Sequence, residues 1–250
     1  MKTYTLHYWP SIPGRGEYVR LAFEYAKVPF ADNSSNVNAL QEHVMRSNKT
    51  GLPQHFAPPI LEVKQEATNS SRFISQIPAI LSYLAPRLDL TEEEKSIARA
   101  HVNQLTLTIL DLSNEIHDVH HPIASSLTYE EQQEESKRRA KFFREVRLPK
   151  FFGYFESVLA ENRAGSGANL FGSSMTTADL TLFQVVDGLR FAYPNLLSRL
   201  EAENKCKHVF GLHEKIGNTE PIASYVKSDR RRSYSMGLFR HYPELDEPAM

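Results

Sequence analysis

Two consecutive prolines, Pro58 and Pro59, stand directly before a short apolar run, Ile60–Val63, whose composition is typical of a strand. Proline has no N–H to give to a sheet, so it is found at the first residue of a strand or in a turn. A cis X-Pro bond at such a place turns the polar groups of the preceding residue outward, where they can bond an extended peptide. The pair therefore predicts a site for a small peptide. The alternative is a loop that happens to hold two prolines.

Histidines and a cysteine offer two further candidates. His117 and His121 are four residues apart, the spacing at which helical histidines can chelate a metal. Pro122 predicts that the helix ends here, and histidines near a helix C-terminus are also favoured by its dipole. No second group of ligands follows, so we predict no metal. Cys206 is the single cysteine of the chain, which excludes an internal disulfide, fits a reducing compartment and gives little support to a catalytic role.

Bulk composition excludes several classes of function. The chain has 250 residues, 41% hydrophobic and 24% charged, with a formal net charge of -1, so charge does not favour nucleic acid or an anionic membrane. No apolar run reaches the ~18 residues of a membrane span, and the N-terminus lacks the features of a signal peptide. These observations predict a cytoplasmic protein with no nucleic-acid or membrane partner.

A small α/β unit is expected to position the proline pair. Residues 1–85 predict the order β-α-β and then β-β-α, and residues 91–250 are nearly free of strand signals and predict an all-helical domain. The elements expected in the first part are strands at Thr3–Trp9, after Val28, at Ile60–Val63 and at Arg72–Ile74, and helices at Arg15–Lys27, around Asn38–Arg46 and at Pro78–Leu84. Helices expected in the second part are Thr91 to about His117, Tyr129–Ala160 with a break or kink at Pro149, Thr176–Val186, Asn195–Cys206, Lys207–Ile216 and Pro221–Ser228.

This order of elements, with four local motifs, resembles a cytosolic glutathione S-transferase. The resemblance implies a thioredoxin-like α/β domain followed by an all-α domain, and it runs along nearly the whole chain. The motifs are Tyr8 followed by Gly14-Arg15-Gly16-Glu17, then Pro59-Ile60-Leu61-Glu62, then Gln76-Ile77-Pro78-Ala79-Ile80-Leu81-Ser82-Tyr83-Leu84, and finally the capping box Met175-Thr176-Thr177-Ala178-Asp179-Leu180. The first motif is similar to the tyrosine-type classes, in particular the sigma group. Residues 115–122 and 237–245 look like a fungal subgroup, some members of which act in secondary metabolism.

The resemblance assigns roles in glutathione chemistry. A free thiol has a pKa of ~8.5, so little of it is ionised at neutral pH. Tyr8 is implied as the hydroxyl that stabilises the thiolate, with Arg15 as the cation that orients Tyr8. Tyr4, at the same strand parity, is the competing tyrosine and is expected in the core. The implied glutathione contacts are Tyr8, Lys49 (with Arg46 and His43 behind it), Pro58, Pro59, Gln76, Ile77 and, across a homodimer interface, Asn103 with Gln104 nearby.

Two positions depart from the family pattern. The family usually has Ser or Thr after the glutamine, where this chain has Ile77, and loss of a charge-assisted hydrogen bond costs about 1.5–3 kcal/mol. The residue before the cis proline normally offers both N–H and C=O, and Pro58 has no N–H. Both departures predict weaker binding of glutathione without a change of fold.

The second substrate is expected to be an electrophilic, largely apolar small molecule beside Tyr8. Candidates for its contacts are Pro10, Ile12, Leu107 and Asp111, and the tail aromatics Tyr234, Phe239 and Tyr242 either cap this site or simply pack on the surface. Addition of the thiol followed by elimination would make the same site a double-bond isomerase. The alternative from another class is a non-catalytic binding module with the same fold.

Overall fold

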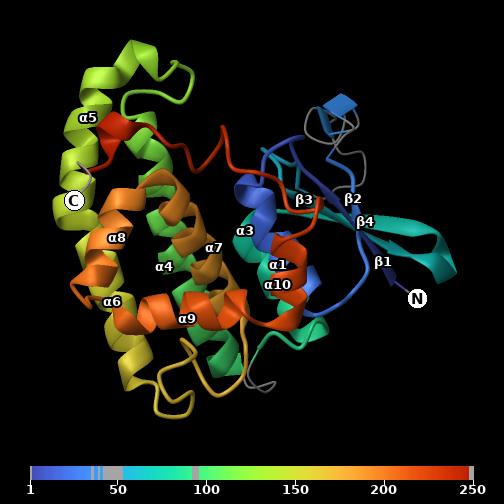
Figure 1. The fold of residues 1–250 in the computed structure, drawn as a ribbon. Coiled ribbons are helices and arrows are strands. Elements are labelled where there is room, and N and C mark those ends of the chain that lie inside the picture. The colour runs from blue at the N-terminus through green and yellow to red at the C-terminus, as the bar shows by residue number, and fades with distance from the viewer. Residues whose placement is uncertain (1, 35–36, 39, 42–52, 92–95, 248–250) are drawn as a thin grey trace. The chain divides into compact units, whose positions relative to one another are not determined.

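A computed structural model describes residues 2–34, 37–38, 40–41, 53–91 and 96–247 (Figure 1). The chain divides into two compact units. The first unit comprises Met1–Leu90 and Glu220–Ser233, and the second comprises Thr91–Thr219 and Tyr234–Met250. A helix far along the sequence, at Glu220–Val226, is thus grouped with the N-terminal sheet, although its sequence number falls within 91–250. The expected helix around 38–46 and the expected helix start at Thr91-Glu92 fall largely outside the described residues.

The first unit contains a four-stranded sheet in the order β2-β1-β3-β4. Strand β1 pairs in parallel with β2 and antiparallel with β3, and β3 pairs antiparallel with β4. Antiparallel neighbours can be joined by a short turn, whereas the parallel pair needs a crossover, which here contains helix α1. The strands are β1 Lys2–His7, β2 Ala31–Asp32, β3 Ile60–Gln65 and β4 Ser70–Ser75.

Three described helices accompany this sheet, namely α1 Glu17–Tyr25, α3 Ile77–Leu84 and α10 Glu220–Val226, and a short 3-10 turn at Gly14–Gly16 leads into α1. Helix α1 contacts both α3 and α10. Pro78 lies in the first turn of α3, where its missing N–H is not needed. The core of the unit is built from fully buried side chains such as Leu6, Phe23, Leu61 and Ile80.

The second unit is helical in all its described regular elements (Figure 1). Helix α7 is almost entirely buried and contacts α4, α8 and α9. The expected helices are present with shifted ends, the largest shift being the extension of α7 to Ala192. The helices are α4 Ser96–His120, α5 Gln133–Phe142, α6 Leu148–Glu161, α7 Thr177–Ala192, α8 Pro194–Ala202 and α9 Lys207–Gly217.

Pro149 does not end the long helical region, so of the expected break or kink the break is absent, and the irregularity takes the form of a π-helical turn just before the proline. A π-helical turn at Phe143–Arg147 joins α5 directly to α6, and the N–H of Leu148 bonds to the carbonyl of Phe143 five residues earlier. In an α-helix the proline ring would clash with the carbonyl four residues before it. The wider π turn places Pro149 in the first turn of α6, where proline is tolerated.

The capping box that begins α7 is present. The Asp179 carboxylate accepts hydrogen bonds from the N–H groups of Leu170 and Thr176, at 2.7 and 2.8 Å, and from the Thr176 hydroxyl at 2.7 Å. Asp179 is fully buried, and burial raises the pKa of its carboxyl to about 6. Because this pKa lies above the ordinary value, the native state holds a proton that the unfolded state has already released between about pH 4 and 6.

We expect Asp179→Asn to lower the free energy of unfolding by about 1–3 kcal/mol at pH 7, because an amide oxygen cannot accept all three hydrogen bonds. The substitution also removes a titration. As pH rises from about 4 to 6, the wild type should therefore lose up to about 3 kcal/mol relative to the variant. Denaturant unfolding across this pH range measures both effects. Parallel pH profiles for the two proteins would contradict the assigned burial effect.

Candidate active site at one end of the sheet

Three of the predicted site residues meet at one end of the sheet because of strand register. His7 of β1 is paired with Ile60 of β3, and Ile60 is paired with Ser75 of β4. Continuing each strand by one residue places Tyr8 opposite Pro59, and Pro59 opposite Gln76. Each of these three residues adjoins a paired strand end, so they lie at the same end of the sheet. The peptide bond between Pro58 and Pro59 is cis, as expected from the sequence.

Tyr8 is held by the turn that precedes α1. Its side chain is 5% exposed, and its hydroxyl oxygen accepts a hydrogen bond from the backbone N–H of Arg15 at 2.7 Å. A Cβ at Gly16 would lie 2.8 Å from the phenol ring, and a Cβ at Gly14, which has a φ of +47°, would also clash with it. The two glycines are therefore required for the turn to lie against the ring.

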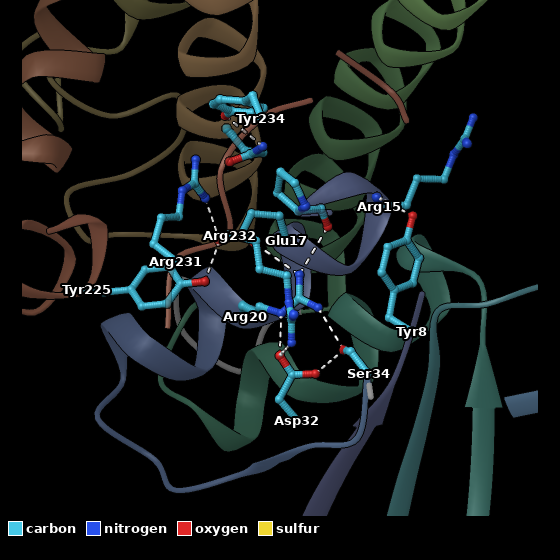
Figure 2. Close-up of polar contacts among 12 residues, drawn as sticks. Tyr8, Arg15, Glu17, Arg20, Asp32, Ser34, Tyr225, Arg231, Arg232 and Tyr234 are labelled. Carbon is cyan, nitrogen blue, oxygen red and sulfur yellow. Dashed lines mark hydrogen bonds and ion pairs between the residues drawn. The ribbon is translucent and has the colours of Figure 1, made fainter. Parts of the chain in front are cut away.

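The phenol of Tyr8 is a hydrogen-bond donor at neutral pH. Burial raises its pKa above the ordinary value, and the Arg15 N–H and the positive charges of Arg15 and Arg20 oppose this rise only in part. The hydroxyl accepts from Arg15, so its own hydrogen is directed elsewhere. The Arg15 guanidinium points away from the phenol in Figure 2, and its contact with the hydroxyl is made by the backbone.

A buried ionic cluster that no sequence motif predicted supports the same turn. Arg20 is 1% exposed and donates to Asp32 at 2.8 Å and to Glu17 at 3.0 Å. It also donates to the carbonyl of Pro13 at 3.0 Å, and its guanidinium lies 5.8 Å from the centre of the Tyr8 ring. Figure 2 shows this guanidinium between the two carboxylates. Arg20 thus fixes both ends of the turn that carries the Arg15 N–H.

Residues from the C-terminal part of the first unit complete the cluster. Tyr225 donates its hydroxyl to Glu17 at 2.6 Å, Arg231 forms an ion pair with Glu17, and Arg232 donates to Asp32 at 3.2 Å. Three guanidinium groups and two carboxylates therefore share this region. The only signal in the sequence was the i,i+3 spacing of Glu17 and Arg20, which is equally common on solvated helix faces.

Helix α3 begins beside the cis proline. Gln76, its N-terminal flanking residue, is exposed and has a φ of 71°, an uncommon conformation for a residue other than glycine. Ile77 is only 6% exposed, so its side chain packs in the unit.

His55 contacts Ser75 at 3.0 Å, and burial lowers the pKa of its imidazole. First-turn N–H groups of a helix bind anions, and this helix end can therefore receive a carboxylate.

The remaining candidates fall in different parts of the chain. Pro10 and Ile12 lie in the segment after β1 and are partly exposed. Asn103, Gln104, Leu107 and Asp111 are exposed positions of α4 in the second unit. Lys49 lies outside the described residues, as do Arg46 and His43.

Comparison with known proteins matches this architecture. Residues 117–229 match the family model described as glutathione S-transferase, C-terminal domain. The chain has the glutathione S-transferase fold. A solved structure of a Fasciola hepatica sigma class enzyme of this name has a TM-score of 0.68 at 18% identity, covering 94% of this chain and 98% of that one.

Two curated proteins named glutathione S-transferase are similar to most of the chain. The one from Plasmodium yoelii yoelii is 25% identical over 224 residues, which is 88% of this chain and 92% of that protein. The one from Plasmodium falciparum (isolate 3D7) is 23% identical over 234 residues, which is 91% of this chain and 97% of that protein. The expected α/β domain followed by a helical domain is therefore confirmed.

The histidine cluster and Cys206, which lie away from the sheet end of this glutathione S-transferase fold, show structural features and no catalytic arrangement. His120 contacts the carbonyl of Leu238 at 3.1 Å, and burial lowers the pKa of its imidazole to about 3. No group of three or more potential ligands among the described residues could hold a metal ion. Burial raises the pKa of the Cys206 thiol to about 11, so it stays protonated at neutral pH. No helix in the described ranges is both long and apolar enough to span a membrane.

The tail aromatics pack within the second unit. Tyr234 donates its hydroxyl to Asp187 at 2.7 Å, and Phe239, 2% exposed, occupies the space that a side chain at Gly188 would need. Tyr242 stacks on Tyr129 with ring centres 3.8 Å apart. These contacts attach the last described residues to the helices of their own unit.

Proposed function

We propose that this chain is a cytoplasmic glutathione transferase in which Tyr8 stabilises the thiolate of glutathione for addition to an electrophilic, largely apolar small molecule. The observation that carries the proposal is the placement of Tyr8, Pro59 and Gln76 at one end of the sheet. The buried phenol would meet the thiol, the backbone at the cis proline would bond the peptide, and the start of α3 would bind a terminal carboxylate.

The proposed chemistry uses the hydrogen of the Tyr8 hydroxyl. Arg15 donates to the oxygen of that hydroxyl, which makes the phenol a better donor to a sulfur anion. A reduction of the thiol pKa by about two units needs ~2.7 kcal/mol of differential stabilisation. A buried hydrogen bond to a charged group and the nearby guanidinium groups of Arg15 and Arg20 can supply this amount together.

The peptide part of glutathione is proposed to bind along the cis proline and α3. The carbonyl of Pro58 accepts from the cysteinyl N–H, while the missing N–H of Pro58 removes the return bond. The γ-glutamyl carboxylate is proposed to meet Gln76 and the N–H of Ile77. Lys49 for the glycyl carboxylate and Asn103 from the second subunit of a homodimer remain part of the proposal. So do Pro10, Ile12, Leu107 and Asp111 as contacts of the electrophile.

The finer assignments from the sequence belong to the same proposal. These are the tyrosine-type, sigma-like class, the fungal subgroup and a place in secondary metabolism. Elimination after addition would allow the same residues to isomerise a conjugated double bond. A homodimer is part of the same proposal, and Phe56, which lies two residues before Pro58 and is 89% exposed, is a candidate contact residue.

The direct test is consumption of glutathione by the purified protein with an aryl halide and with an enone. We expect measurable turnover with at least one of these classes, above the spontaneous reaction. Turnover with neither, although glutathione binds in calorimetry, would favour the non-catalytic binding module. Absence of both binding and turnover would contradict the proposal entirely.

Restoring the hydroxyl that the family usually has after the glutamine should tighten glutathione binding. We expect Ile77→Thr to lower the Kd about tenfold, because a charge-assisted hydrogen bond contributes about 1.5–3 kcal/mol, part of which is lost in imperfect geometry. Threonine keeps the β-branch of isoleucine but loses its terminal methyl, a loss of packing that Ile77→Val reproduces without adding a hydroxyl. Calorimetric titration measures the Kd. The matched control is Ile77→Val, which has the same branching without a hydroxyl and should bind like the wild type. Equal affinities for all three proteins would show that this position does not reach the carboxylate.

A further inference from the structure

The turn from Pro13 to Glu17 carries the backbone N–H that reaches the Tyr8 hydroxyl, and it cannot be capped by its own side chains. The N–H of Glu17 bonds to the carbonyl of Pro13 at 3.2 Å and closes the turn. Pro13 and Gly16 flank the starts of the 3-10 turn and of α1, and neither has a side chain that could accept a hydrogen bond. The position of the turn therefore depends on contacts that other residues make with its two ends.

The fit between this turn and Tyr8 leaves little room for movement. The Arg15 N–H lies 2.7 Å from the phenol oxygen, and the ring occupies the space that a Cβ at Gly14 or Gly16 would need. A shift of the turn toward the ring would produce a clash, and a shift away would weaken the hydrogen bond. Burial raises the pKa of the Tyr8 phenol, and the N–H groups of Arg15 and Gly16 oppose this rise. The strength of Tyr8 as a donor is thus sensitive to where the turn lies.

Glu17 connects the turn to residues from the C-terminal part of the first unit. Its carboxylate is completely buried, so both oxygens need donors. Oε2 accepts from Arg20 at 3.0 Å, whereas Oε1 accepts from the Tyr225 hydroxyl at 2.6 Å and forms an ion pair with Arg231. Burial and the negative charge of Glu17 raise the pKa of Tyr225, so this hydroxyl remains a donor at neutral pH.

Tyr225 itself is held in place. It belongs to α10, which contacts α1, and its side chain is only 1% exposed. The guanidinium groups of Arg230 and Arg231 lie 5.4 and 6.0 Å from the centre of its ring. The direction of the Tyr225 hydroxyl is therefore fixed, and it fixes in turn the orientation of the Glu17 carboxylate.

We propose that Tyr225 is a positioning residue for the reaction, because through Glu17 it fixes the turn whose N–H groups set the strength of Tyr8 as a donor to the thiolate. This role rests on the proposed function and adds to it a residue 208 positions away from Glu17 in the sequence. A tyrosine that only stabilised the fold would have no effect on the pKa of a bound thiol.

The test is the pKa of the thiol of bound glutathione in Tyr225→Phe, followed by the ultraviolet absorbance of the thiolate. The substitution removes one neutral hydroxyl and changes no charge, so it exerts no direct Coulomb effect on the sulfur. We expect the pKa of the bound thiol to rise by about half a unit to one unit, and kcat/KM at pH 5.5 to fall about three- to tenfold. The Kd of glutathione should change less than about twofold, because the Tyr225 hydroxyl is occupied by Glu17.

The matched control is Tyr129→Phe. Tyr129 is 4% exposed and donates its hydroxyl to Glu244 at 2.9 Å, so it loses the same kind of hydrogen bond in the second unit. Its variant should be less stable to denaturant, as Tyr225→Phe should be, but it should keep the thiol pKa of the wild type.

A double-variant cycle tests the route of the effect. If Tyr225 acts through the Tyr8 hydroxyl, adding Tyr225→Phe to Tyr8→Phe should cause no further rise in the thiol pKa. An equal rise in both backgrounds would contradict the proposed route. Circular dichroism checks that each variant is folded. Should Tyr225→Phe not fold, Arg231→Lys takes its place with the same expected direction, since it keeps the charge and alters the other donor to the same Glu17 oxygen.

The outcomes separate this inference from the proposed function. A bound thiol with a lowered pKa in the wild type and the same pKa in Tyr225→Phe would overturn the positioning role and leave the proposed function intact. A wild-type complex whose thiol ionises at the same pH as free glutathione would overturn both.

Discussion

Replacing Arg20 by methionine is expected to lower the free energy of unfolding by about 3 kcal/mol, near the lower end of the range for breaking a buried ion pair. Methionine has a similar length and flexibility, so the main loss is the charge with its four hydrogen bonds. Arg20 holds Glu17, Asp32, Ser34 and the carbonyl of Pro13 while only 1% exposed. Glu17 would remain buried and Asp32 half-buried, each with fewer partners.

The cost should not reach the upper end of that range because other cations remain. Arg231 still pairs with Glu17, and Arg232 still pairs with Asp32. Asp32 has a lowered pKa because of its hydrogen bond to Arg20, so the stability that this carboxylate contributes is lost as pH falls below its ordinary pKa. The Arg20→Met variant should therefore also lose part of the acid sensitivity of the wild type.

Denaturant unfolding gives the measurement, and Arg139→Met is the matched control. Arg139 pairs with Asp118 at 3.2 Å, but its side chain is 39% exposed, so its removal should cost less than about 1 kcal/mol. If Arg20→Met unfolds at the same denaturant concentration as Arg139→Met, the buried cluster does not stabilise the turn as argued.

The second large effect is expected for Tyr8→Phe, which should lower kcat/KM for a model electrophile about ten- to hundredfold near pH 6.5. The Tyr8 hydroxyl is proposed to account for most of a two-unit reduction in the pKa of the bound thiol. Its loss should therefore return this pKa toward the ordinary value of ~8.5. The difference between the proteins should therefore shrink as pH rises above that value, where the thiol ionises without help.

The control for this variant is Tyr4→Phe. Tyr4 lies in β1, four residues before Tyr8, and so shares its strand parity. Its ring packs on Phe23 with ring centres 5.2 Å apart, and it pairs with Val63, four residues beyond the cis proline. Its activity should match that of the wild type. Equal pH-rate profiles for Tyr8→Phe and wild type would remove Tyr8 from the mechanism.

Local sequence signals identified those parts of the fold that depend on local chemistry. The proline pair indicated a cis bond before a strand, because proline at a strand start cannot donate to the sheet and an X-Pro bond has a reduced preference for trans. Thr176 and Asp179 indicated the start of a buried helix through their reciprocal capping. Tyr8, Pro59 and Gln76 were named by resemblance. The strand register that brings them to the same end of the sheet became available only with the structure.

Features that depend on distant residues could not be derived in the same way. Arg20 and Glu17 are polar residues in an amphipathic segment, and their burial depends on Tyr225 and Arg231, which are about 200 residues away. The π turn before Pro149 needed backbone geometry that side-chain periodicity does not report.

The most direct test of the account is the pKa of the thiol of glutathione bound to the wild-type protein, followed by the ultraviolet absorbance of the thiolate in a pH titration at saturating glutathione. The account predicts a value about two units below the ~8.5 of the free thiol, and a return to that value in Tyr8→Phe. A bound thiol that ionises at the same pH as free glutathione would contradict the role of Tyr8, whatever the turnover observed.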